Sequence, residues 1–133
     1  MRVADLMQTD LQSVAPDMTV AQAVMRLSDA HVHGVPVVDG SGQIVGVLTT
    51  TDVLNAAAET AGSEERERLF DQTTVEEIMT SRPMTVDPDT DVKEAAQQML
   101  YLEVHRLFVE HDGQLVGVIA QSDIVRAVAL ARI

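Results

Sequence analysis

Apolar residues along the chain follow two alternating periods. After Thr19 and after Asp91 they recur every three to four positions, the spacing of one face of an amphipathic helix of about twelve residues. Each helical stretch is followed by two short runs rich in β-branched residues, separated by a turn with glycine beside aspartate, which predicts a hairpin. A second helix is then predicted to start near Thr51-Asp52 and near Ser122-Asp123. The same succession of elements therefore occurs twice.

The two halves of the chain also repeat one another residue by residue. A shift of 72 places Leu6-Met7 on Ile78-Met79, and after one deletion a shift of 71 aligns the hairpins and second helices. Patterns that fit a capping box open the first helix of both copies, at Thr19-Val20-Ala21-Gln22 and Asp91-Val92-Lys93-Glu94. We therefore expect a helix to start at the same place in each copy.

Each copy is predicted to be a β-α-β-β-α unit with a short leading strand, around Ser13-Val14 in one and Met84-Thr85-Val86 in the other. Such a unit is too small to bury its sheet face alone, so we expect an α/β (α+β) fold whose copies pack about a pseudo-twofold axis. We predict one repeat over residues 1–60, a charged helical connection over 61–73 and a second repeat over 74–133. A cleft between the copies is the expected place for a ligand.

The composition of the chain excludes several functions for this predicted fold. The 133 residues include no cysteine and only 2% aromatic residues, and 21 acids against 9 bases give a net charge of −12. The missing cysteines exclude disulfides, thiolate zinc sites and a cysteine nucleophile, and the negative charge disfavours nucleic acid as a partner. Because we find neither a signal peptide nor an apolar run of roughly 20 residues, we expect a cytoplasmic protein without membrane contact.

Equivalent segments of the repeat resemble a known family. Gly46-Val47-Leu48-Thr49-Thr50-Thr51-Asp52 and Gly117-Val118-Ile119-Ala120-Gln121-Ser122-Asp123 are similar to the closing motif of cystathionine-β-synthase (CBS) domains. Val35-Pro36-Val37-Val38-Asp39, Ala4-Asp5-Leu6-Met7 and Glu77-Ile78-Met79-Thr80 resemble the rest of the pattern. The resemblance covers residues 3–58 and 75–130.

The resemblance implies a free-standing tandem CBS pair with no chemistry of its own. Such a pair binds AMP, ADP, ATP or an adenosyl ligand such as S-adenosylmethionine in the cleft between its copies, and it relays occupancy to a partner protein. The family commonly forms homodimers, and the apolar stretches Ala56-Ala57-Ala58 and Val125 to Leu130 would suit self-association. The regulated partner cannot be named from the sequence.

The resemblance implies two ligand sites, of which we expect the one at Asp52 to be the better. Asp52, at the first turn of a helix, can accept hydrogen bonds from ribose hydroxyls beside the hydroxyls of Thr49 and Thr51. The purine would lie between aliphatic side chains, for which the candidates are Leu11, Val37, Met84 and Val109.

The second site, at Asp123, is predicted to have fewer polar groups. Ala120 stands in place of a threonine hydroxyl, so this site would depend on Ser122 and Gln12. Phosphate groups would be bound by His105-Arg106, because arginine can bind phosphate oxygens bidentately, and the equivalent place in the first copy is His33-Gly34. Arg82 is a further candidate cation.

Other interpretations remain open at this point. Asp52 and Asp123 can simply cap helices, and the histidines can be ordinary polar residues at the start of a strand. A catalytic role for Thr49-Thr50-Thr51 is not expected, because no base is placed to activate a hydroxyl. We expect no metal at His31-x-His33 either, since no carboxylate at helical spacing supports it. The alternative function is a dimerisation or protein-interaction scaffold with degenerate sites.

Overall fold

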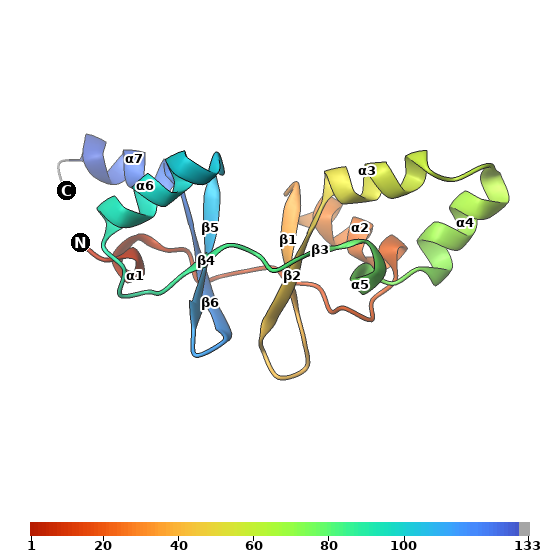
Figure 1. The fold of residues 1–133 in the computed structure, drawn as a ribbon, viewed down its shortest axis with the longest axis horizontal. Helices are drawn as coiled ribbons and strands as arrows, with labels where there is room; N and C mark the ends of the chain where they lie inside the picture. The colour runs from red at the N-terminus through yellow and green to blue at the C-terminus, as the bar shows by residue number, and fades with distance from the viewer. Residues whose placement is uncertain (131–133) are drawn as a thin grey trace. The chain divides into compact units, whose positions relative to one another are not determined.

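The computed structural model describes residues 1–130 and divides the chain into two compact units (Figure 1). The first unit, Gln12–Pro83, contains Asp52 and is called the Asp52 unit below. The second combines Met1–Leu11 with the chain from Met84 onward, and is called the Asp123 unit. The mixed α+β fold expected from the sequence is confirmed, because each unit has one three-stranded sheet with helices.

The Asp52 unit is built around an antiparallel sheet in the order β1-β2-β3. The predicted leading strand at Ser13-Val14 is reduced to one parallel bridge between Val14 and Val37. The elements of this unit are α2 (Val20–Ala30), β1 (Gly34–Val38), β2 (Ile44–Thr49), α3 (Thr50–Ala58), α4 (Ser63–Gln72), α5 (Val75–Ile78) and β3 (Thr80–Ser81).

The Asp123 unit has a mixed sheet in the order β4-β5-β6, in which the predicted leading strand β4 runs parallel to β5. Gln8 forms an antiparallel bridge with Val118 beside this sheet. The elements are α1 (Val3–Leu6), β4 (Thr85–Val86), α6 (Val92–Leu102), β5 (Arg106–His111), β6 (Gln114–Ala120) and α7 (Gln121–Ala129).

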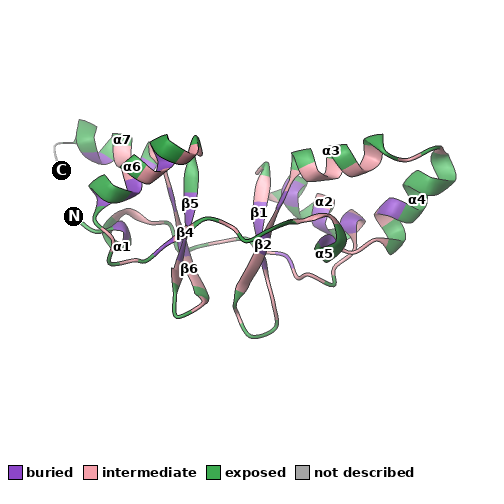
Figure 2. Ribbon diagram, in the orientation of Figure 1, coloured by how far each residue is buried: buried purple, intermediate pink, exposed green. Residues whose placement is uncertain are grey.

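The segment that opens each sequence repeat folds with the other repeat. Val3, from the start of the chain, is fully buried in the core of the Asp123 unit, and Val75 is fully buried in the core of the Asp52 unit. The two valines are equivalent under the shift of 72. We call Met1–Leu11 and residues 74–83 the crossing segments. Their apolar side chains complete the cores that Figure 2 shows along the strands and the inner sides of the helices.

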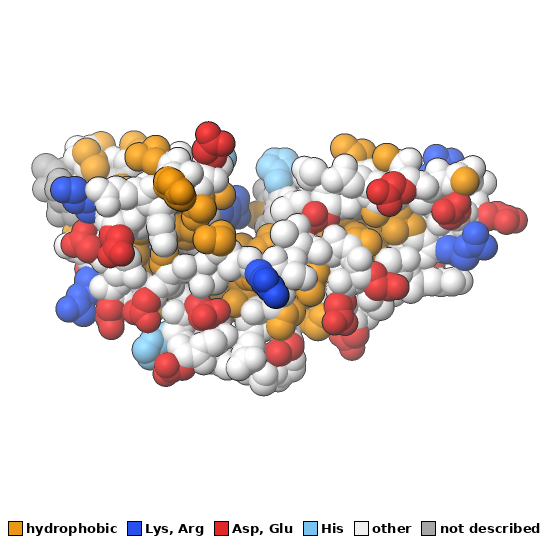
Figure 3. Space-filling model, viewed as in Figure 1, with side chains coloured by type: hydrophobic (Ala, Val, Ile, Leu, Met, Phe, Trp, Pro, Cys, Tyr) orange, Lys and Arg blue, Asp and Glu red, His pale blue; other side chains and the backbone are white. Residues whose placement is uncertain are grey.

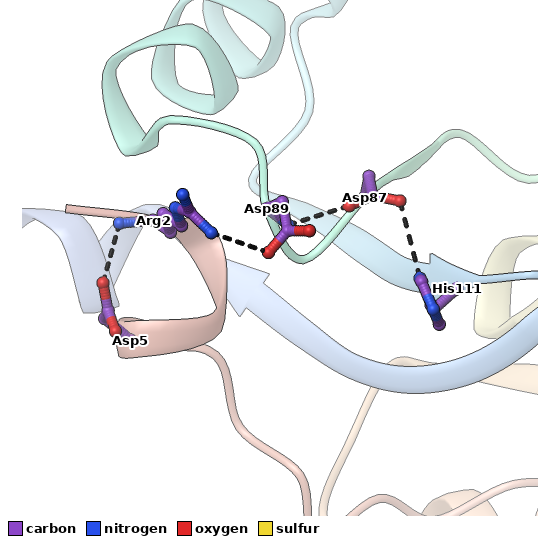
Figure 4. Close-up of polar contacts among 5 residues, drawn as sticks. All are labelled: Arg2, Asp5, Asp87, Asp89 and His111. Atoms are coloured by element: carbon purple, nitrogen blue, oxygen red, sulfur yellow. Dashed lines mark hydrogen bonds and ion pairs between the residues drawn. The ribbon is translucent and has the colours of Figure 1, made fainter.

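Polar contacts hold the first crossing segment against its unit (Figure 4). The backbone N–H of Arg2 donates to Asp5 and its guanidinium lies 3.1 Å from Asp89, whose own backbone N–H donates to Asp87. His111 of β5 lies 3.7 Å from the other oxygen of Asp87. This contact network connects the N-terminal segment to the turn before α6 and to the sheet.

Most predicted helix starts and turns are confirmed. Thr19 and Gln22 form the expected capping box on α2. Asp91 does cap α6, but its carboxylate accepts from the N–H of Lys93, and no hydrogen bond returns from Glu94 to the cap. The predicted capping box is wrong at this helix, where the backbone pairs with the N-terminal segment instead.

The connection between the repeats contains a helix, α4, as the sequence indicates. Leu69 is the buried residue of α4, which packs against α2 and α3 within the Asp52 unit. No helix among the described residues is long and apolar enough to cross a lipid bilayer.

Candidate functional site

Asp52 lies in the first turn of α3, where it is half-buried and takes part in a capping box. Its Oδ2 accepts from the N–H of Thr49 at 2.9 Å, and the hydroxyl of Thr49 accepts from the N–H of Asp52 at 3.1 Å. Its Oδ1 accepts from the hydroxyl of Thr80 at 3.1 Å. Asp52 therefore does cap α3, as the alternative interpretation of the sequence expects. Capping uses its Oδ2.

Acceptor capacity remains at this carboxylate. Each carboxylate oxygen can accept about two hydrogen bonds, and Oδ1 receives one, from a hydroxyl that can turn toward another partner. Thr51 is exposed one position before Asp52. The N-terminus of α3 adds a field that favours the negative charge of Asp52. The arrangement can bind a neutral polyol, such as a ribose, through its hydroxyl groups.

Asp123 occupies the equivalent place at the start of α7, but it is more fully used. Its Oδ2 accepts from the N–H of Ala120 at 2.8 Å, and its Oδ1 accepts from the side-chain amide of Gln8 at 3.1 Å. The guanidinium of Arg126 lies 3.7 Å from Oδ1, and Asp123 is only 7% exposed. Asp123 lines a small cavity of about 130 Å³ together with Arg126 and Asp5.

Thr80 and Gln8 are polar neighbours that the sequence analysis missed. Both belong to crossing segments, and they are equivalent under the shift of 72. That equivalence was visible in the sequence, but nothing local showed that either residue would meet a carboxylate more than twenty positions away. The repeat shows that Gln8 and Thr80 are equivalent. Only the structure shows that each crossing segment folds with the other repeat and so reaches the aspartate there.

Several other predicted site residues lie in the Asp123 unit, whereas Arg82, the further candidate cation, is exposed in the Asp52 unit. Arg106 is exposed at the start of β5 and makes no ion pair with any described residue. His105 is exposed beside it, with Nδ1 3.4 Å from the side-chain oxygen of Gln121. Ser122 and Met84 are also exposed, Met84 by 51%.

The remaining predicted residues, Gln12 and His33, belong to the Asp52 unit, where both are exposed. Gln12 and Asp123, which the sequence analysis assigned to one site, therefore fall in different units. Two expected purine contacts are wrong, because Val37 and Val109 are fully buried in the two hydrophobic cores and offer no surface to a ligand. Leu11 is partly exposed and stays a prediction.

A larger cavity of about 790 Å³ lies within the Asp52 unit, against α2, α3 and α4. His33 and Thr51 line it, together with aliphatic side chains and Phe70, whereas Thr49 and Asp52 do not. No lysine or arginine lines this cavity, so it offers no bidentate partner to a phosphate. We therefore place the candidate site at Asp52. Among the described residues no group of three or more histidine, aspartate or glutamate side chains is placed to hold a metal ion.

Comparison with known proteins assigns the family. The sequence matches the family described as "CBS domain" twice, over residues 3–59 and 75–130. The chain therefore belongs to the CBS domain family, as the resemblance implied.

Relatives and solved structures extend over nearly the whole chain. It is 30% identical to the CBS domain-containing protein YhcV of Bacillus subtilis, covering 92% of this chain and 81% of that protein. It is 31% identical to the chloroplastic protein CBSX1 of Arabidopsis thaliana, covering 89% of this chain but only 59% of that protein. The structure of Arabidopsis CBSX2 in complex with AMP superposes with a TM-score of 0.81 at 30% identity, covering 99% of this chain and 98% of that one.

Proposed function

We propose that this chain is a non-catalytic regulatory module that binds an adenine nucleotide or adenosyl ligand at Asp52 and relays its occupancy to a partner protein. The observation that carries the proposal is the carboxylate of Asp52, held at a helix N-terminus with spare acceptor capacity. The similar protein CBSX2, solved in complex with AMP, supports the choice of an adenine nucleotide.

AMP is a more favourable ligand than ATP on electrostatic grounds. The chain carries a net charge of −12, and each further phosphate adds negative charge to the ligand. Arg82, which belongs to the same unit as Asp52, is exposed and is the candidate phosphate partner. A single phosphate needs fewer cations than a triphosphate, and the neutral ribose and purine require none.

The experiment is titration calorimetry with AMP, ATP and S-adenosylmethionine on the wild-type chain and on Asp52→Asn. The substitution keeps the size of the side chain and one acceptor oxygen but removes the charge. A hydrogen bond to a charged group contributes about 1.5–3 kcal/mol, so we expect AMP to bind roughly 10- to 100-fold more weakly.

The matched control is Asp10→Asn, which removes the same charge from an exposed residue that makes no side-chain hydrogen bond with the described residues. AMP affinity should stay within about twofold in this control, since the charge of an exposed side chain is screened by salt. Equal AMP affinity in wild type and Asp52→Asn would refute the assigned site.

The alternative function is a dimerisation or protein-interaction scaffold, and one observation favours it: large apolar side chains are exposed on α6 and α7. Thermal unfolding separates the two functions. A ligand at 100 times its Kd adds about 2.7 kcal/mol of stability, so a nucleotide should raise the unfolding temperature. A panel of adenine nucleotides and S-adenosylmethionine that produces no shift supports the scaffold.

A further inference from the structure

The two aspartates at the helix starts are held in closely matched backbone frames. Gly46 of β2 and Gly117 of β6 each lie against a crossing segment, so that an added Cβ would be 2.8 Å from the carbonyl oxygen of Thr80 and 2.9 Å from that of Gln8. Gln8 exchanges backbone hydrogen bonds with Val118, and Thr80 pairs with Val47 of β2. Differences between the two sites therefore come from side chains rather than from the backbone.

The side chain that meets each carboxylate from the crossing segment is chemically different. Thr80 carries a hydroxyl, which can donate to Asp52, rotate away, or accept a hydrogen bond itself. Gln8 reaches Asp123 with an amide N–H, which can only donate. A ribose hydroxyl can share Asp52 with Thr80, because the hydroxyl of Thr80 can turn away, whereas at Asp123 it has to compete with the amide of Gln8 for a nearly buried carboxylate.

The helix adds a second difference at the same carboxylate. Arg126, one turn along α7, lies 3.7 Å from Oδ1 of Asp123, whereas the equivalent residue on α3 is the neutral, exposed Asn55. Removing the partners of a nearly buried carboxylate is costly unless the ligand replaces them. Ala120 offers no hydroxyl to help, where Thr49 does.

We propose that Gln8 and Arg126 block Asp123 as a ribose acceptor, so that the chain binds one AMP, at Asp52. The inference rests on the proposed function. It assigns the choice between two nearly symmetric sites to the side chains of Gln8 and Arg126. These residues are positioning residues, because they act through the carboxylate of Asp123 rather than on the ligand.

The test transfers the side chains of the Asp52 unit to the Asp123 unit. The variant Gln8→Thr/Ala120→Thr/Arg126→Asn is compared with wild type by calorimetry and native mass spectrometry with AMP. We expect one AMP per chain in wild type and two in the triple variant. Adding Asp52→Asn to the triple variant should leave one AMP per chain, and adding Asp123→Asn as well should remove it.

The reverse exchange is a second, independent measurement. Thr80→Gln places an amide against Asp52, and we expect this variant to bind AMP at least tenfold more weakly than wild type. The control is Thr80→Ser, which keeps the hydroxyl and should keep wild-type affinity. Thermal unfolding of every variant checks that it is folded.

The outcomes separate the two proposals. Absence of AMP binding in wild type refutes the proposed function and, with it, this inference. One AMP in wild type that depends on Asp52, with one AMP still in a folded triple variant, overturns the inference alone. Two AMP molecules per wild-type chain, or unchanged AMP affinity in Thr80→Gln, also overturns it.

Discussion

At the scale of single residues, many of this chain's carboxylates act on backbone N–H groups. Asp39, Asp52, Asp91 and Asp123 each accept a backbone hydrogen bond at a turn or helix start. With 21 acids and 9 bases there are too few cations for every carboxylate to form an ion pair, and a backbone N–H is the alternative donor. The charge of the chain is thus partly used to stabilise its own turns.

Asp39 allows a test of this role by pH. The hydroxyl of Ser41, followed by the N–H of Gln43, lowers the pKa of this carboxyl below its usual value. Because the folded-state pKa is lowered, the stabilisation is present above the unfolded-state pKa, about 3.9, and is lost as the pH falls through the folded-state value. We expect the urea midpoint of Asp39→Asn to lie below that of wild type at pH 7 and pH 5, with the gap closing below about pH 4. Urea unfolding across this range measures it, and a gap of the same size at pH 3 would contradict the role.

At the scale of elements, the helices and hairpins could be predicted from the sequence because their signals are local. The helical period after Thr19, and the Asp112-Gly113 turn, where both residues have positive φ, need only neighbouring residues to be recognised. The crossing segments could not be predicted, since Val3 and Val75 are valines that either core could accommodate. For the same reason the contacts of Gln8 and Thr80 with the aspartates had no local signal, although both aspartates were identified.

The close approach of a crossing segment to β2 makes Gly46 sensitive to substitution. In Gly46→Ala the new Cβ would lie 2.5 Å from Sδ of Met79 and 2.8 Å from the carbonyl oxygen of Thr80. The methionine can move, but the backbone has to shift, so we expect a loss of about 1–3 kcal/mol. Gly40→Ala is the control, because nothing lies within 4 Å of the added Cβ, and it should change stability by less than about 0.5 kcal/mol. Denaturant unfolding of both variants measures the difference, and equal stability would mean that the segment is not tightly packed here.

At the scale of the whole molecule, apolar surface and net charge act in opposite directions on self-association. Exposed apolar side chains lie on α6 and α7 and directly after α7, where Figure 3 shows orange patches; they are Leu100, Tyr101, Val125, Val128 and Leu130. Burying them between two chains is favourable, but bringing together two chains of −12 is not. The homodimer predicted from the sequence should therefore depend on ionic strength.

We expect the chain to dimerise more tightly as salt rises, because the Debye length falls from about 10 Å at 0.1 M to about 3 Å at 1 M and screens the repulsion. Val125, exposed by 65%, is the position to test. Val125→Glu places a charge on the apolar face, so we expect its association constant to fall roughly tenfold or more, since a buried, unpaired charge is costly. Gln114→Glu adds the same charge to the exposed start of β6 and serves as the control.

Sedimentation velocity at two salt concentrations measures the association constants of wild type and of both variants. A Val125→Glu chain that associates as tightly as Gln114→Glu would show that this face takes no part in the dimer, and an association weakened by salt would show that ion pairs, rather than apolar contacts, hold the chains together.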